Sequence, residues 1–181
     1  MNKKHFVTLF PSCPNFGLVK DVGQIPYTLA KSDKKFSTEL VSCDLNLKGE
    51  FIDEVEGLKL TKIKKIINYP VAGMLYLFKH SKSIDCLNIY HYGRKTYLWN
   101  MIYKMINPKG YTYLKLDMDF IACDKLDKNK REIRKFNRYI EKMDLVSVES
   151  RDILERLKKY TKNGGLTLQL GLNQLTNEIN N

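Results

Sequence analysis

Short apolar runs alternate with longer amphipathic segments along most of the chain. The runs are rich in β-branched and aromatic residues, which is typical of buried strands. We predict strands at His5–Phe10, Phe36–Cys43, Leu58–Ile63, Ile84–Tyr90, Tyr111–Leu116 and Leu145–Val148. Between them, apolar residues at helical spacing predict helices at Gly23–Lys31, Tyr69–His80, His91–Ile106, Asn129–Lys142 and Arg151–Tyr160.

The segment Tyr69–His80 carries Val71, Met74, Leu75 and Phe78, which fall on one side of a helix. We expect this side to be buried. The helix His91–Ile106 is dense in tyrosine, tryptophan and methionine. We expect most of these residues in the core, although with Lys104 and Arg94 nearby they could also form a surface that faces lipid or stacks on sugar.

Strands that alternate with helices predict βαβ units and a mainly parallel sheet. The expected fold class is α/β, a Rossmann-like three-layer sandwich. Parallel crossovers bring the C-terminal ends of the strands to one edge, where such sheets bind ligands. Four segments follow predicted strands and should share that edge: Asn15–Gly23, His91–Lys95, Asp117–Asp119 and Glu149–Arg151.

The expected domain organisation is a Rossmann-like domain over residues 1–162 and a tail over residues 163–181. In the tail, leucines alternate from Leu166 to Leu172. This stretch is either an extended strand or the truncated start of a connection to a further lobe.

The chain of 181 residues has a formal net charge of +11 and a hydrophobic content of 43%. The apolar content is enough for a core and argues against wholesale disorder. The charge suits anionic partners, such as nucleic acid, phosphorylated ligands or anionic lipid headgroups, and a surface that is merely basic and inert is the alternative interpretation.

The four cysteines, at positions 13, 43, 86 and 123, form no C-x-x-C pair, which argues against a zinc site. Each adjoins an apolar run, so we expect buried free thiols in a reducing compartment. We expect no signal peptide and no transmembrane helix, because the apolar runs are too short. The expected location is the cytoplasm.

The first loop contains Gly17 and Gly23. They permit close backbone approach, and the helix that follows offers free N–H groups to an anion. The spacing is not G-x-G-x-x-G, so no dinucleotide fingerprint is present. A turn that simply needs glycine is the alternative interpretation.

In "NIYHYGRKTYLWN", His91 follows a strand and precedes a helix. A histidine there can hydrogen-bond a substrate hydroxyl or carry a proton, and Gly93 lets the backbone turn close to a ligand. Arg94 and Lys95 could hold phosphate. The other histidines, His5 and His80, lack this context, and we expect them to be structural.

Asp117 and Asp119 form a D-x-D pair at a strand end, which could share a divalent cation. Oxygen-ligand sites need more than two carboxylates, so we expect no metal, and we interpret the following "DKLDKNK" as a solvated run. Further along, Glu149 and Arg151 could face a cleft, whereas Ser150 or Asp152 is more simply a helix cap.

The order of a glycine-containing loop, "DVGQIPYTLAK", "HYG", "YLKLDMD" and "DLVSVESRDILERLKKY" resembles the N-terminal half of a GT-B glycosyltransferase. The resemblance is to the family-4 kind that works on capsule or exopolysaccharide, and it spans most of residues 4–162. It implies an acceptor-binding lobe, with the nucleotide-sugar donor bound mainly by a second lobe.

Carried over by position, the resemblance places Gly17 and Gly23 in a cleft that faces the donor phosphates. His91 matches a strand-end histidine that contacts the transferred sugar or the acceptor. Lys115 and Asp117 match a sheet-edge pair found in some members. Glu149 and Ser150 match the region after the sixth strand, where members commonly have serine.

This sequence also departs from the family pattern. The first-loop glycines are separated by "LVKDV", and "LQLGLNQL" stands where members have P-N-G-x-D, so that Gly171 and Asn173 echo the motif without its proline. The donor lobe's paired glutamates have no counterpart, since Glu178 is the only acidic residue in the tail.

The resemblance therefore implies half of an enzyme, with little or no transferase activity by itself. Its expected partners are a nucleotide-sugar co-substrate, a glycan or lipid-diphosphate acceptor, a membrane surface contacted peripherally and a separate C-terminal lobe, with no cofactor. Two alternatives stay open: a single-domain metal-dependent transferase using Asp117 and Asp119, and a nucleic-acid-binding module built on a basic helix at Lys125–Lys142.

Overall fold

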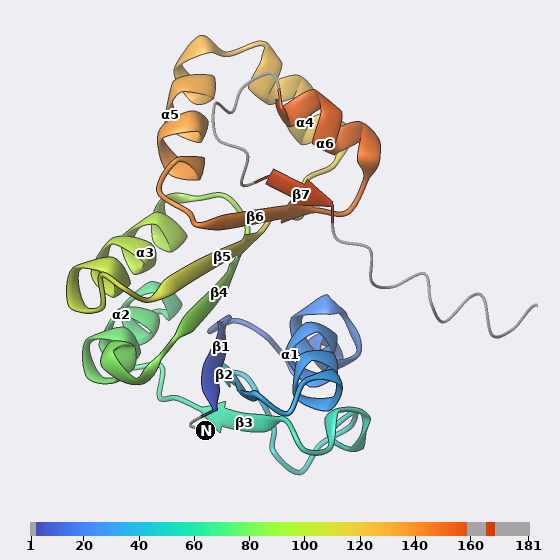
Figure 1. The fold of residues 1–181 in the computed structure, drawn as a ribbon, viewed down its shortest axis with the longest axis vertical. Coiled ribbons are helices and arrows are strands. Elements are labelled where there is room, and N and C mark those ends of the chain that lie inside the picture. Colours follow the sequence, from blue (N-terminus) through green and yellow to red (C-terminus); the bar gives the residue numbers. More distant parts are fainter. Residues whose placement is uncertain (1–2, 159–165, 169–181) are drawn as a thin grey trace, which may run out of the picture. The chain divides into compact units, whose positions relative to one another are not determined.

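The computed structural model describes residues 3–158 and 166–168. The chain divides into two compact units, residues 1–113 and residues 114–181, which are described separately below. Strand β5 (Tyr111–Lys115) crosses the division (Figure 1).

The first unit is built from four strands and three α-helices, followed by the start of β5. Its elements are β1 (Lys4–Leu9), α1 (Asp21–Ser32), β2 (Phe36–Ser42), β3 (Lys59–Lys62), α2 (Tyr69–His80), β4 (Cys86–Tyr90) and α3 (Arg94–Ile106). Short 3₁₀ helices occur at η1 (Asn15–Val19), η2 (Asp53–Val55) and η3 (Ser81–Ser83).

The strands of the first unit form a parallel sheet in the order β3-β2-β1-β4. Leu9 near the end of β1 is in register with Val41 of β2 and Ile89 of β4. The loops that follow these three strands therefore leave the sheet at one edge, as the βαβ pattern predicts.

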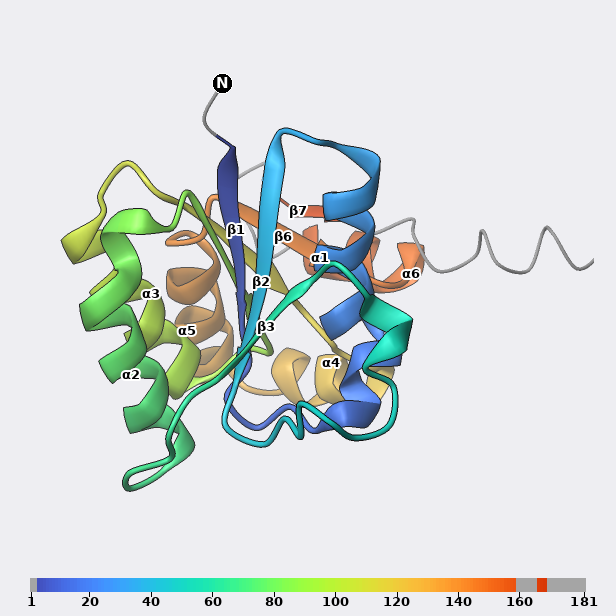
Figure 2. The ribbon, with the colours of Figure 1, turned by 90° about the horizontal axis from the view of Figure 1, so that it is seen from below.

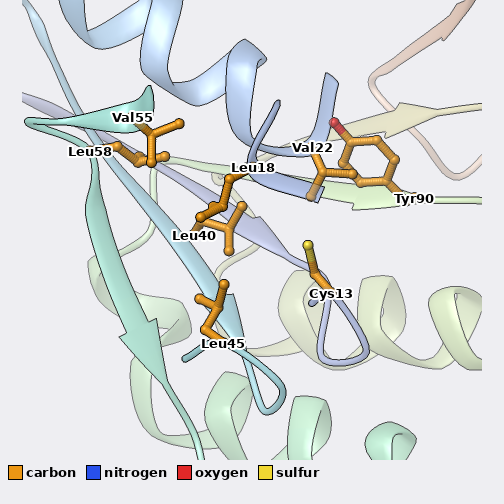
Figure 3. Packing of buried hydrophobic residues seen from close by; sticks show 8 residues of the cluster. All are labelled: Cys13, Leu18, Val22, Leu40, Leu45, Val55, Leu58 and Tyr90. Carbon is orange, nitrogen blue, oxygen red and sulfur yellow. The ribbon is translucent and has the colours of Figure 1, made fainter. Parts of the chain in front are cut away.

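Helices cover both faces of this sheet, with α1 on one face and α2 and α3 on the other (Figure 2). The α1 side encloses a cluster of eight buried residues, shown in Figure 3: Cys13, Leu18, Val22, Leu40, Leu45, Val55, Leu58 and Tyr90. The cluster joins the first loop and η1 to β2, so apolar burial holds that loop against the sheet.

On the opposite face, α2 and α3 pack closely through Gly73 and Trp99. A β-carbon on Gly73 would lie 2.6 Å from the Trp99 ring, and the indole N–H donates to the Pro70 carbonyl at 2.9 Å. Trp99 and Tyr103 are fully buried, but Met101 and Met105 are exposed. The expectation that most of the aromatic and methionine residues of this helix lie in the core is therefore wrong.

The sequence prediction for α2 chose the wrong side of the helix. The structure buries Ala72, Gly73, Tyr76 and Leu77, whereas Leu75 and Phe78 are exposed. The helix is apolar on both sides, so its spacing alone could not show which side meets the sheet. Gly73 allows the close approach to Trp99, and this contact selects the buried side.

In its described residues, 114–158 and 166–168, the second unit contains the end of β5, two strands and three helices. Its remaining elements are α4 (Phe120–Asp127), α5 (Lys130–Ile140), β6 (Leu145–Val148), α6 (Arg151–Lys158) and β7 (Leu166–Leu168). The strands β6 and β7 are parallel, with Val146 in register with Leu166. The Leu116 N–H donates to the Ser147 carbonyl at 2.9 Å, which sets the end of β5 beside β6.

Helix α4 was not predicted. Asp119 begins it as N-cap, with its carboxylate accepting the Ala122 N–H at 2.7 Å. The run "DKLDKNK", expected to be merely solvated, lies largely within α4. It is partly structural, because Arg156 of α6 pairs with Asp124 at 2.5 Å and with Asp127 at 2.6 Å. These acids hold α4 to α6, a role that depends on a residue about thirty positions away and so leaves no local signal.

The prediction of one continuous basic helix over residues 125–142 is also wrong. Helix α4 ends at Asp127 and α5 begins at Lys130. Asn129 separates them, since its side chain accepts the N–H groups of Arg131 and Glu132 and caps α5.

The predicted α/β class, with a mainly parallel sheet covered by helices, is confirmed. The six predicted strands occur within about two residues of their expected bounds, and the alternating leucines include β7. All four cysteines are free; three are buried and Cys86 is partly buried. Among the described residues, no helix is long and apolar enough to cross a membrane.

Candidate functional site at the C-terminal edge of the sheet

His91 stands at the end of β4, on the edge of the sheet from which the first loop also leaves. Its imidazole meets the Phe10 ring edge-on, with centroids 5.5 Å apart, and lies 6.2 Å from the Tyr90 ring. Phe10 and Tyr90 stack on each other at 5.6 Å. The loop after β1 and the strand-end histidine are therefore neighbours, and the imidazole contacts two aromatic rings.

The backbone of His91 has φ +66°, in the left-handed region that non-glycine residues rarely adopt. Its carbonyl accepts the Thr96 hydroxyl at 3.0 Å, which ties this turn to the first turn of α3. Strain of this kind concentrates at functional sites, where the surrounding structure holds it in place.

The N-terminus of α3 follows His91 and carries positive charge. Arg94 and Lys95 are its first two residues, its first turn has no acidic residue, and its N-cap, Gly93, has no side chain to accept a hydrogen bond. Cations at a helix N-terminus oppose the helix dipole, whereas an anion there is stabilised. No atom lies within 4 Å of the position of a Gly93 β-carbon, so the space beside this turn is open.

The N-terminus of α1 is less suited to an anion. Asp21 occupies its first turn, so a carboxylate already lies at its positive end. The N–H of Gly23 donates to the Lys20 carbonyl at 3.1 Å, and that of Gly17 to the Pro14 carbonyl at 2.9 Å. Both glycine amides therefore have partners within the loop.

Packing explains why glycine occupies both positions. A β-carbon on Gly17 would lie 2.4 Å from the Cys13 sulfur, and one on Gly23 would lie 2.3 Å from the Leu18 carbonyl oxygen. Both residues are buried. Close packing within the first loop and against α1 is therefore what requires glycine at these two positions. This agrees with the alternative interpretation, a turn that simply needs glycine.

Hydrogen bonds join the loops after β1 and β2. The Asn15 amide donates to the carbonyls of Asn46 and Glu50, both at 2.9 Å, and accepts the Asn46 N–H at 2.8 Å. The Ser42 hydroxyl lies 2.7 Å from the Cys13 carbonyl. These bonds give the edge beside His91 a defined shape.

Sequence reasoning missed the polar groups beneath this edge. Asn88 and Tyr90 lie on the α1 side of β4, both nearly inaccessible to solvent. Among the described residues, neither the Tyr90 hydroxyl nor the Asn88 Oδ1 has a well-formed hydrogen bond, although the Asn88 side chain lies close enough to favour the ionised phenol. Burial, with the Asp21 carboxylate adding to it, raises the pKa of Tyr90 far above its usual value, so the phenol stays protonated. The one sequence signal that could have revealed these buried polar groups was an asparagine, Asn88, inside an apolar strand.

In the second unit, Lys115 and Glu149 form a pair. The Lys115 side chain at the end of β5 is fully buried, and its ammonium lies 2.7 Å from the Glu149 carboxylate, which is 54% exposed. A buried lysine needs such a partner, because removing its charge from water is costly. The sequence placed both residues at a sheet edge, and the structure shows that they contact each other.

Asp117 is exposed just after β5. Asp119 is the α4 cap, so the two carboxylates of the D-x-D pair stand in different settings. Within the described residues, no group of three or more histidine, cysteine, aspartate or glutamate side chains could hold a metal ion.

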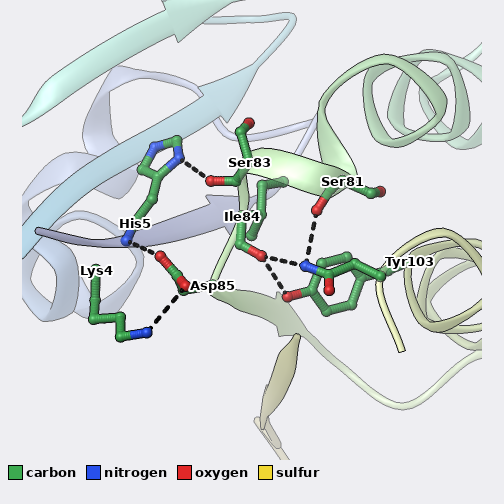
Figure 4. A network of polar contacts seen from close by, with 8 residues as sticks. Lys4, His5, Ser81, Ser83, Ile84, Asp85 and Tyr103 are labelled. Atoms are coloured by element: carbon green, nitrogen blue, oxygen red, sulfur yellow. Dashed lines mark hydrogen bonds and ion pairs between the residues drawn. The ribbon is translucent and has the colours of Figure 1, made fainter. Parts of the chain in front are cut away.

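A polar network lies at the opposite, N-terminal edge of the first unit's sheet (Figure 4). In that view His5 bonds the Ser83 carbonyl through Nδ1 at 3.0 Å, and its backbone N–H donates to the Asp85 carboxylate at 2.8 Å. Outside the view, His5 Nε2 bonds Glu39 at 3.1 Å, and the Lys59 ammonium lies 2.9 Å from the same Glu39 oxygen. His5 is structural, as expected. Because this network sits at the edge away from His91, it is separate from the candidate site.

No known family model matches the chain, and no curated protein sequence matches it. A solved structure does: the crystal structure of a glycosyltransferase from Rickettsia africae ESF-5, with a TM-score of 0.53 and 10% sequence identity. The likeness covers 93% of this chain and 43% of the Rickettsia chain. At this identity it establishes a shared α/β fold, and this chain spans less than half the length of that protein.

Proposed function

We propose that this chain is the acceptor-binding part of a two-lobed glycosyltransferase. It transfers a sugar from a nucleotide-sugar to a glycan acceptor carried on a lipid diphosphate, together with a second lobe that holds most of the donor. In this proposal the reaction is a step of polysaccharide synthesis and takes place at the cytoplasmic face of a membrane.

The fold likeness to part of a glycosyltransferase supports the reaction class. The observation that carries the proposal is local: His91, held at φ +66° by its neighbours, immediately precedes a helix whose N-terminus bears Arg94 and Lys95. A strand-end imidazole beside an anion-attracting helix end suits a substrate that combines hydroxyls with phosphate.

The proposed roles follow from these positions. His91 hydrogen-bonds a hydroxyl of the acceptor or of the transferred sugar and orients it, and its half-buried ring is able to exchange a proton with it. Arg94, Lys95 and the first amides of α3 bind the diphosphate. Asp117 and Glu149 are proposed as substrate contacts of the second unit, and the fully buried Lys115 acts only by placing Glu149.

Transfer requires donor and acceptor to be oriented together in a closed site. We therefore propose that this chain alone transfers little or no sugar. The observations give less support to the two alternatives. Asp119 is engaged as a helix cap, which weakens a metal pair, and the basic helix proposed for nucleic-acid binding is interrupted at Asn129.

Calorimetric titration with inorganic pyrophosphate tests the anion site. We expect binding by the wild-type chain and a loss of at least tenfold in affinity for the double variant Arg94→Gln/Lys95→Gln, since two charge-assisted contacts are removed. The matched control is Lys34→Gln/Lys35→Gln, which removes two exposed charges between α1 and β2. Equal affinity in both variants would refute the assignment.

A second assay tests the reaction itself. Radiolabelled nucleotide-sugars are incubated with lipid-linked acceptors and this chain, first alone and then with a separately produced second lobe. Transfer is expected only with the second lobe, and it should fall by at least a hundredfold with His91→Ala. Robust turnover by the chain alone would contradict the division of labour.

A further inference from the structure

The outer faces of α2 and α3 are apolar although they face solvent. On α2, Leu75 and Phe78 are 47% and 55% exposed, on the side opposite the buried Ala72 and Leu77. On α3, Leu98, Met101 and Met105 are 42%, 44% and 70% exposed. The three residues of α3 are spaced i, i+3 and i+7, and so form one stripe along the helix.

The two exposed stripes lie on neighbouring helices of one layer. The close contact of Gly73 with Trp99 holds α2 beside α3, and both helices lie on the same face of the first unit's sheet (Figure 2). Because each stripe is opposite the side of its helix that meets the core, both point away from the sheet. We call these five residues, Leu75, Phe78, Leu98, Met101 and Met105, the outer apolar face.

The charged residues that α2 and α3 themselves carry are all positive. Helices α2 and α3 contain no acidic residue, and Asp85 is the only acid between Gly57 and Leu116. Lys79, Lys82 and Lys109 are exposed at the ends of the two helices. Exposed apolar groups at this density mark an interaction site, and the surrounding charge indicates an anionic partner.

We propose that the outer apolar face binds the surface of an anionic lipid bilayer, with its side chains at the boundary of headgroups and acyl chains and the flanking lysines on the headgroups. Interfacial helices bind membranes in this way, through one apolar side and a basic margin. Binding of this kind does not depend on sugar transfer, so vesicle binding and transferase activity can fail separately.

A second copy of the chain is a poorer occupant. A two-fold dimer through this face would bring the lysines of both copies together, with no acid on either helix pair to neutralise them. An anionic headgroup layer supplies the missing negative charge. The bilayer therefore satisfies the apolar stripe and its charged margin together.

Sedimentation with lipid vesicles tests the proposal on the full chain. Vesicles with about 30% phosphatidylglycerol in phosphatidylcholine should bind the wild type, and pure phosphatidylcholine should bind it far more weakly. Phe78→Ser/Met105→Ser should lower the partition coefficient at least tenfold, because two apolar side chains are lost. Lys79→Gln/Lys82→Gln should lower it about fivefold for each lysine.

Matched controls distinguish binding through the outer apolar face from nonspecific adsorption by any exposed apolar residue or any basic residue. Ile121→Ser removes an exposed apolar residue of α4, and Lys34→Gln/Lys35→Gln removes two distant charges. Both should bind anionic vesicles like the wild type. Circular dichroism confirms that each variant is folded, and all changes are at exposed positions.

A fluorescence measurement locates the contact directly. Phe78→Trp should be quenched by brominated acyl chains in anionic vesicles, whereas Ile121→Trp should not. Unchanged vesicle binding by Phe78→Ser/Met105→Ser, or quenching at residue 121 but not at residue 78, would overturn the proposal. So would a dimer in sedimentation velocity that Phe78→Ser abolishes, because it would assign this face to a second copy.

Discussion

Gly23 of α1 packs directly on the backbone of Leu18, so that a β-carbon at position 23 would lie 2.3 Å from the Leu18 carbonyl oxygen. The neighbour is backbone, which cannot rotate away as a side chain can. This contact allows the 3₁₀ helix η1 to fold back against the first turn of α1 and bury Leu18 in the cluster of Figure 3.

Gly23→Ala should destabilise the protein by about 1–3 kcal/mol, because the added methyl group forces η1 away from α1. Helix propensity alone predicts the opposite sign, a gain of about 1 kcal/mol for alanine over glycine. The free energy of unfolding in urea distinguishes the two. Thr28→Ala, at an exposed position of the same helix, is the control and should be neutral or slightly stabilising.

His91→Gly and His91→Ala should differ in stability. Both lose the ring contacts with Phe10 and Tyr90, but only glycine relieves the left-handed backbone at φ +66°. We therefore expect the glycine variant to be about 1 kcal/mol more stable than the alanine variant, by thermal denaturation. Equal stabilities would mean that the backbone at residue 91 is not strained. In the proposed transfer assay both variants should be equally impaired.

The His5–Glu39 pair should make stability depend on pH. The hydrogen bond to Glu39 raises the pKa of His5 above its ordinary value of 6.5, although burial acts against it. Burial also opposes ionisation of Glu39, but hydrogen bonds from His5, Thr61 and Lys59 outweigh it and lower the pKa of Glu39 to about 2.

The two shifts have opposite consequences with pH. The His5 contribution is complete below pH 6.5 and is lost as pH rises through the raised pKa. The Glu39 contribution is present above about pH 4.5 and is lost as pH falls towards 2. His5→Gln should therefore cost more stability at pH 5.5 than at pH 8.5, measured by urea unfolding. A cost independent of pH would contradict the role of the imidazolium.

Lys115 and Glu149 should respond unequally to mutation. Glu149→Gln leaves a buried ammonium without its counter-charge and should cost about 1–3 kcal/mol. Lys115→Met should cost less, because an unbranched apolar side chain fits a buried site without needing a partner. Urea denaturation of the two variants provides the comparison. The reverse order would show that Lys115 gains little from Glu149.

How far the candidate site was predictable differs from residue to residue. His91 was identified from its place after an apolar strand and before "GRK", which is a local signal. Its neighbours Phe10 and Tyr90 were not identified, because their contact joins the end of β4 to a loop residue about eighty positions earlier. The cap formed by Asp119 was missed because the helix it begins was not predicted.

The alternation of short apolar runs with amphipathic segments determined the fold class, since a strand that is buried on both faces and a helix between two such strands can form few other architectures. It also determined that the first loop and His91 leave the sheet at one edge. The tertiary structure alone decided which side of α2 is buried, because both sides are apolar and only the fit of Gly73 to Trp99 distinguishes them. It likewise decided the partners of Lys115 and Arg156, since contacts between distant segments depend on how elements pack and not on local spacing.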